Sequence, residues 1–184
     1  QHVLGKDLPR ETITATFGIP LAQALQDLAP EHADELLRIY RQYSDEAGFS
    51  MLYEIDGAHD TIRALHDMGC TIAIVTSKKE VNATAQMDYI GIGDYVDFLV
   101  GPEKTTAHKP DPAPIYCALE HLGVNAEDAL MVGDSPHDIL CGKNAHVDTA
   151  GVRFTAVDLD SLLATSPTYM LSHLSELLPL AKAQ

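Results

Sequence analysis

Two aspartates, Asp134 and Asp138, follow a short apolar segment that ends at Gly133. We expect a strand at 129–132 and a helix from Pro136, which places Asp134 at the strand tip and Asp138 on the first helical turn. Two carboxylates that converge there repel each other unless a cation joins them, and oxygen ligands are those that Mg²⁺ prefers. The pattern predicts a magnesium site. The alternative is a helix N-terminus that acidic residues stabilise without a metal.

Hydroxyl and ammonium groups follow two other apolar segments. Thr76 and Ser77 come directly after segment 70–75. Between a strand and a helix, such hydroxyls and the free backbone N–H groups either bind an anion or cap the helix. Lys109 lies in segment 108–112, whose two prolines restrict the backbone around it. A lysine held in this way suits a phosphate oxygen or a carboxylate, and an exposed turn lysine is the alternative.

The elements that position these residues alternate from about residue 56 onward. Helices are expected around 62–68, 79–89, 112–122, 136–145 and 172–182, and strands at 70–76, 96–100, 129–132, 147–151 and 169–171. This alternation predicts an α/β fold, a Rossmann-like doubly wound parallel sheet with helices on both faces. In such sheets the chemistry lies beyond the carboxyl ends of the strands, where all the candidate residues fall.

The first part of the chain shows no strand pattern. Three helices are expected there, with Pro9, Pro20 and Pro30 near their starts and glycines at two of their ends. We therefore predict a small helical domain at 1–52 and an α/β core at 53–184.

Composition excludes several classes of partner. The chain of 184 residues carries a formal charge of −15, which disfavours nucleic acid and anionic membranes because both require basic surfaces. No apolar run is long enough to cross a bilayer. Cys70, Cys117 and Cys141 are widely spaced among apolar neighbours, as reduced thiols of a cytoplasmic protein would be. We expect a cytoplasmic monomer or homodimer that acts on a small molecule.

The order of these motifs resembles a known family. Thr76, then Lys109, then the pair Asp134 and Asp138, each after a strand, resemble the second, third and fourth motifs of the haloacid-dehalogenase-like superfamily. The phrases around them look closest to its phosphoglycolate phosphatase and PpaX-type pyrophosphatase branch. The resemblance covers essentially the whole chain, including the helical part, which corresponds to a cap domain.

The resemblance implies a Mg²⁺-dependent phosphatase that hydrolyses a phosphoglycolate-like substrate or pyrophosphate through an aspartyl-phosphate intermediate. Thr76 and Ser77 would bind the transferring phosphoryl group, and Lys109 would stabilise its charge. Asp134 would bind Mg²⁺, with Asp138 as a direct or water-mediated partner. Phosphoryl transfer depends mainly on such positioning and charge neutralisation.

The cap of this family governs specificity, so the turn Gly18, Ile19 and Pro20 is a candidate for substrate selection. Two other functions stay open. The chain could be a catalytically inactive fragment or a phosphate- or Mg²⁺-binding module, or it could be a phosphomutase. His137, beside the two aspartates, is expected to face solvent.

The family's first motif, an apolar strand followed by Asp-x-Asp-Gly-Thr, supplies the nucleophile and stands before the cap. Nothing in the sequence before Pro9 fits it. Glu54 and Asp56 form a partial match in segment 51–57, but glutamate is one methylene too long and the segment runs directly into a helix pattern. We expect that about 25 to 35 residues, roughly one strand and one helix, are absent at the start. The first core strand would be among them.

Overall fold

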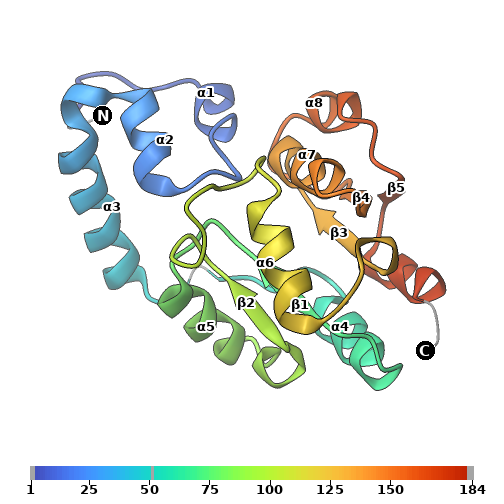
Figure 1. Cartoon of the computed structure of the whole chain (residues 1–184). Helices are drawn as coiled ribbons and strands as arrows, with labels where there is room; N and C mark the ends of the chain where they lie inside the picture. Colours follow the sequence, from blue (N-terminus) through green and yellow to red (C-terminus); the bar gives the residue numbers. More distant parts are fainter. Residues whose placement is uncertain (1–2, 51, 182–184) are drawn as a thin grey trace.

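The computed structural model describes residues 3–50 and 52–181 (Figure 1). Its first part is helical, and its second part alternates strands and helices around parallel sheets. No helix within these ranges is both long and apolar enough to span a bilayer. Figure 1 shows the first three α-helices as a group beside the α/β part of the molecule.

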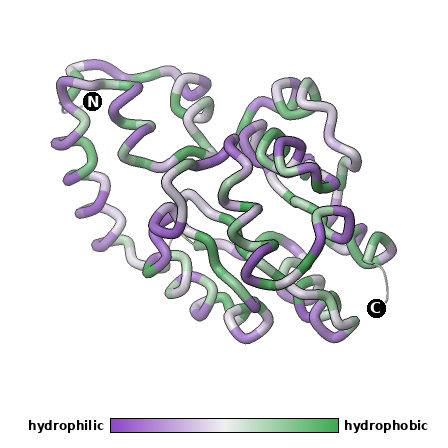
Figure 2. Tube along the Cα trace, in the orientation of Figure 1, coloured by the Kyte–Doolittle hydropathy of each residue, from purple (hydrophilic) through white to green (hydrophobic). Residues whose placement is uncertain are grey.

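The helical part follows its proline pattern. Pro9 and Pro20 lie directly before the first two helices, where a missing N–H group has no cost. Hydrophilic and hydrophobic positions alternate along the third α-helix, the long blue helix of Figure 1 (Figure 2). The elements are α1 (Arg10–Thr14), α2 (Leu21–Leu28), the 3₁₀ helix η1 (Pro30–His32) and α3 (Ala33–Ala47). The boundary of this domain at residue 52 stays a prediction.

The second part contains five short strands with helices between them. The strands are β1 (Ala73–Val75), β2 (Phe98–Val100), β3 (Leu130–Gly133), β4 (Asp148–Val152) and β5 (Tyr169–Leu171). The helices are α4 (Ala58–Asp67), α5 (Glu80–Tyr89), η2 (Gly93–Tyr95), α6 (Ala113–Leu122), η3 (Ala126–Asp128), α7 (Pro136–Asn144), α8 (Leu159–Ala164) and η4 (Leu174–Leu180).

All described strand pairs are parallel, which confirms the α/β class. The strands form two sheets, β1–β2 and β3–β4–β5. We expected one continuous sheet from the sequence, and the structure has two sheets. Within the described residues, β1 pairs only with β2, and β3 pairs only with β4. Helix α6 joins them: it packs against both β1 and β2, and its Ile115 also belongs to a core cluster with α7.

The larger sheet is covered on both faces. Met131 points to a cluster formed with Ile115 and Cys141 of the helices α6 and α7. Its neighbours Leu130 and Val132 point the opposite way, toward residues of β4, β5 and η4. This alternation is the two-residue period of a strand buried on both faces, and it gives the doubly wound arrangement that the sequence predicted.

Three elements differ from the sequence expectations. Strand β1 is shorter than the predicted 70–76, because its main chain pairs with β2 alone within the described residues. Helix α8 was not predicted, although Asp158 caps it by accepting a hydrogen bond from Ser161 N. The last helix is a 3₁₀ helix that contains Pro179, which cannot donate the backbone hydrogen bond of an α-helix.

We predict that Ile139→Ala lowers the free energy of unfolding by about 2–5 kcal/mol, because Ile139 is fully buried in α7 and truncation leaves a cavity. Leu140→Ala is the matched control, since Leu140 is next in the same helix but 37% exposed, and we expect it to cost less than about 1 kcal/mol. Urea unfolding of both variants measures the difference. Equal losses would show that α7 is not packed as described.

Candidate active site

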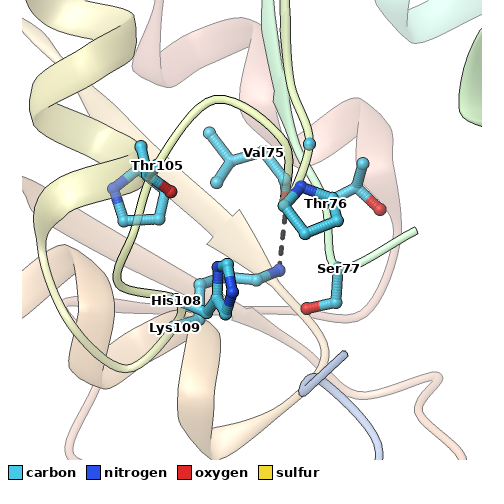
Figure 3. Close-up of a pocket in the computed structure, with 9 residues that line it drawn as sticks. Val75, Thr76, Ser77, Thr105, His108 and Lys109 are labelled. Atoms are coloured by element: carbon cyan, nitrogen blue, oxygen red, sulfur yellow. Dashed lines mark hydrogen bonds between the residues drawn. The ribbon is translucent and has the colours of Figure 1, made fainter. Parts of the chain in front are cut away.

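Lys109 occupies the centre of the candidate site. Its Nζ donates to the carbonyl oxygen of Val75, at the end of β1, over 3.1 Å (Figure 3). It also donates to Oδ1 of Asp138, on α7, over 2.7 Å. The Lys109 side chain is 9% exposed and that of Asp138 is 6% exposed. A cation buried to this extent needs such partners, because transfer out of water is costly. Lys109 therefore connects the end of β1 to the first turn of α7, the helix that follows β3.

Asp138 is held from a second direction by the start of its own helix. Its Oδ2 accepts hydrogen bonds from the backbone N of Ser135 over 3.0 Å and from Ser135 Oγ over 2.7 Å. Ser135 Oγ in turn accepts from Asp138 N, which completes a capping box. A Cβ at Gly133 would overlap the Asp138 side chain, so the strand end must be glycine for this carboxylate to fit.

Asp134 lies at the end of β3 and its side chain reaches solvent, while its carbonyl oxygen accepts from Thr155 Oγ1 over 2.6 Å. Partial burial of the carboxyl group, followed by the negative charge of Asp138, raises the pKa of Asp134 above its ordinary value. The positive charge of Lys109 opposes this rise. Asp134 is thus a carboxylate that a further cation would stabilise.

Thr76 and Ser77 lie between β1 and α5, as predicted. Thr76 Oγ1 accepts from Lys78 N over 3.1 Å, and Ser77 Oγ donates to the carbonyl oxygen of Gly18 over 2.6 Å. Both residues line a small hollow of about 10 Å³ together with Lys109 and His108 (Figure 3). That volume holds about one water molecule. The hydroxyl hydrogen of Ser77 is directed to Gly18, and Thr76 Oγ1 accepts from the backbone of Lys78. Phosphate binding by Thr76 and Ser77 stays a prediction.

The turn of Gly18, Ile19 and Pro20 lies between α1 and α2, and its three residues are half-buried. Gly18 packs against Ser135 and His137, so this cap turn reaches the same helix start as the two aspartates. The expectation that His137 faces solvent was wrong: the residue is half-buried and its Nδ1 is buried without a hydrogen-bond partner in the described part of the chain. No local signal in the sequence predicted that Gly18 would pack against His137.

Glu54 and Asp56 do not form a second catalytic pair. They lie in an irregular segment and turn before α4, where Glu54 Oε1 accepts from His59 N over 3.0 Å and Asp56 lies 3.5 Å from His173. An open hollow of about 460 Å³ is lined by this segment and by Asp60, and it shares no lining residue with the hollow at Lys109. Three acidic side chains there would repel a phosphate. We therefore interpret segment 54–57 as the start of helix α4.

A magnesium ion fits the site through few protein ligands. No group of three or more potential ligands occurs in the described ranges. Mg²⁺ commonly uses one or two carboxylates and completes its shell with water and phosphate oxygens. The solvent-facing Asp134, with its raised pKa, fits the role of direct ligand. Both oxygens of Asp138 are engaged by Lys109 and Ser135, so a water-mediated role suits Asp138 better.

The parallel strands with helices on both faces define an α/β protein. A lysine, two aspartates and two hydroxyl residues near its strand ends form a candidate site for a phosphate and a cation. A family model, haloacid dehalogenase-like hydrolase, matches residues 1–152. The chain belongs to this family of hydrolases. The match confirms the resemblance inferred from the motif order and the hydrolase class that it implied.

Individual proteins agree with this assignment. The chain is 33% identical to pyrophosphatase PpaX of Bacillus velezensis over 177 residues, covering 96% of this chain and 82% of the relative. It is 32% identical to pyrophosphatase PpaX of Listeria monocytogenes over 173 residues, covering 94% and 80%. A haloacid dehalogenase-like hydrolase of Streptococcus pneumoniae, 22% identical, shares the fold with a TM-score of 0.82 over 97% of this chain and 85% of that one.

We predict that breaking the buried ion pair is costly. Lys109→Met leaves a buried carboxylate unpaired and Asp138→Asn leaves a buried ammonium unpaired, so each should lower the free energy of unfolding by about 3–5 kcal/mol. The double variant should lose less than the sum, because the two groups are coupled. Urea unfolding gives this double-mutant cycle. Lys104→Met is the control, since its pair with Glu80 is about one-third exposed and should contribute less than about 1 kcal/mol; an equal loss there would contradict the prediction.

The raised pKa of Asp134 predicts a pH effect of definite sign. A carboxyl group whose folded pKa is raised adds stability while it is protonated, and this contribution is lost as the pH rises from its ordinary value of 3.8 through the folded pKa. Without metal, Asp134→Asn should therefore be more stable than the parent at pH 7, and the difference should disappear below pH 3.8. Thermal unfolding across this range measures it, and a variant less stable at pH 7 would contradict it.

Added magnesium should reverse this order. At about 100 times its dissociation constant, Mg²⁺ should stabilise the parent by about 2.7 kcal/mol and Asp134→Asn much less, because the variant lacks the anionic ligand. The same thermal measurements with and without Mg²⁺ provide the comparison. Equal stabilisation of both proteins would show that the ion binds elsewhere.

Proposed function

We propose that this protein is a Mg²⁺-dependent phosphatase that acts on pyrophosphate or on a small phosphoglycolate-like ester. The observation that carries the proposal is the position of Lys109, a buried cation held between Val75 and Asp138 at the carboxyl ends of two parallel sheets. Membership of a hydrolase family and the similarity to proteins named pyrophosphatase PpaX support it.

Each residue has a separate task in this proposal. Lys109 neutralises charge on the transferring phosphoryl group, and its fixed position avoids the cost of reorganisation during the reaction. Backbone N–H groups around Thr76 and Ser77 orient the phosphoryl oxygens. Asp134 holds the magnesium ion, which when bound supplies positive charge to the phosphoryl oxygens and to the leaving group. Asp138 fixes Lys109 and orients water near Asp134.

The attacking group in this proposal is an aspartate that becomes phosphorylated and is then hydrolysed. Among the described residues, the carboxylate beside Lys109 is Asp138, whose oxygens already accept from Lys109 and Ser135, and Asp134 is assigned to the metal. Glu54 and Asp56 belong to the start of α4, so none of these is left as the attacking group. Within the described residues, β1 pairs only with β2 and β3 only with β4. We propose that the aspartate lies on a strand that pairs between β1 and β3, near Lys109 at the end of β1. A parallel strand there would present its carboxyl end to Lys109 and Asp134, as its neighbours do.

A second candidate function follows from the same observation. With Lys109 and Asp134 in place but no attacking carboxylate beside them, the described residues alone would bind phosphate and Mg²⁺ without turnover. The two candidates make different predictions for one assay, because only the phosphatase releases inorganic phosphate.

The test is phosphate release from pyrophosphate, from phosphoglycolate and from a general aryl phosphate, with Mg²⁺ and with a chelator. We expect release that depends on Mg²⁺ and that falls by about 10²–10³-fold in Lys109→Met, a loss typical of removing one charge-stabilising donor. Lys104→Met serves as the control and should retain its rate, since Lys104 pairs with Glu80 at the surface. Phosphate binding without release would instead identify the binding function.

A further inference from the structure

The core holds the cap turn through one hydrogen bond at the site. Ser77 Oγ donates to the carbonyl oxygen of Gly18 over 2.6 Å, although the two residues are 59 positions apart. Ser77 follows β1 and Gly18 lies between α1 and α2. A hydroxyl group has a single hydrogen to donate, so in this arrangement Ser77 directs it to the cap and not to a phosphoryl oxygen.

Gly18 also fits closely against the start of α7. Its φ of +94° is in the region that favours glycine, and a Cβ there would lie 2.5 Å from Ser135 Oγ and 3.3 Å from the Cβ of His137. Ser135 cannot easily move aside, because it is 1% exposed and its side chain is committed to the capping box with Asp138. Any side chain at Gly18 must therefore push the turn away from the core.

A second contact between cap and core lies at the other end of the cap. The rings of Phe49, just after α3, and Tyr89, at the end of α5, stack with centroids 4.6 Å apart. This stacking is close along the chain to the connection between cap and core, whereas Gly18 is far from it. The helical cap thus contacts the core at two places: Phe49 stacks on Tyr89 near the connection between cap and core, and Gly18 accepts from Ser77 at the site.

We propose that Ser77 and Gly18 form a latch that holds the turn at residues 17–20 over the phosphate end of the site, so that the latch limits the size of the leaving group. This inference deepens the proposed phosphatase function and rests on it. With the latch closed, the turn lies against Ser77, Ser135 and His137, and Ser77 in turn lines the hollow beside Lys109. In this proposal, a leaving group of the size of phosphate displaces the turn less than a bulkier aryl group does.

Ser77 is a positioning residue in this proposal, because it acts through Gly18. Its loss should therefore change the preference between substrates. If the Ser77 hydroxyl served instead only to bind the phosphoryl group that all substrates share, its loss would raise KM for each of them by the same factor.

The first test does not depend on catalysis. Gly18→Ala should raise hydrogen-exchange rates of the backbone amides at 15–21 by roughly fivefold, as expected for loss of about one hydrogen bond, and Ser77→Ala should do the same. Gly48→Ala is the matched control: Gly48 also has a positive φ, +54°, but a Cβ there meets nothing within 4 Å. Its exchange at 15–21 should stay unchanged. Unchanged exchange in both latch variants would overturn the latch even if the protein proves to be a phosphatase.

The second test compares substrates in the same three variants. Gly18→Ala and Ser77→Ala should each raise the ratio of kcat/KM for an aryl phosphate to that for pyrophosphate by roughly three- to tenfold, and Gly48→Ala should leave the ratio unchanged. A ratio unchanged in both latch variants, with faster exchange, would show a latch that does not select substrates and would overturn that part of the proposal. Absence of turnover in every variant and in the parent, with faster exchange, would contradict the phosphatase function and the size selection while keeping the latch.

Discussion

The buried ion pair of Lys109 and Asp138 is the interaction on which the rest of the site depends. It joins the end of β1 to the first turn of α7, and each partner is satisfied by a further group, Val75 for the lysine and Ser135 for the aspartate. A buried pair that is fully hydrogen-bonded fixes geometry more than it adds stability. Its main effect is to set the distance between the end of β1, with Thr76 and Ser77, and the start of α7, with Asp134.

The two aspartates, Asp134 and Asp138, differ because only Asp138 pairs with Lys109. Asp138 is buried and paired with Lys109, whereas Asp134 faces solvent at the end of β3. Partial burial of its carboxyl group, followed by the negative charge of Asp138, raises the pKa of Asp134. Two identical side chains four residues apart thus obtain different properties from their surroundings. One is a structural anion, and the other is suited to a hydrated ion that must exchange with substrate.

Sequence reasoning predicted the class of fold and the residues at the strand ends, because strand periodicity and the Gly133–Asp134 boundary are local signals. It could not predict that Ser77 would bond to Gly18, since that contact joins segments 59 positions apart and depends on how the cap docks. For the same reason it placed His137 in solvent. Helix α8 was missed because its six residues carry little periodicity. Long-range packing, not local propensity, decided the contact of Ser77 with Gly18 and the burial of His137.

The two separate sheets also have a mechanical consequence. A ladder of main-chain hydrogen bonds resists sliding between neighbouring strands, whereas the two sheets are joined, within the described residues, by the side-chain packing of α6 and by the contacts of Lys109. Thr76 and Ser77 follow β1, and Asp134 follows β3, so the candidate site takes its residues from two sheets. The stiffness of the α6 packing and of the Lys109 contacts therefore sets how accurately these residues stay in line.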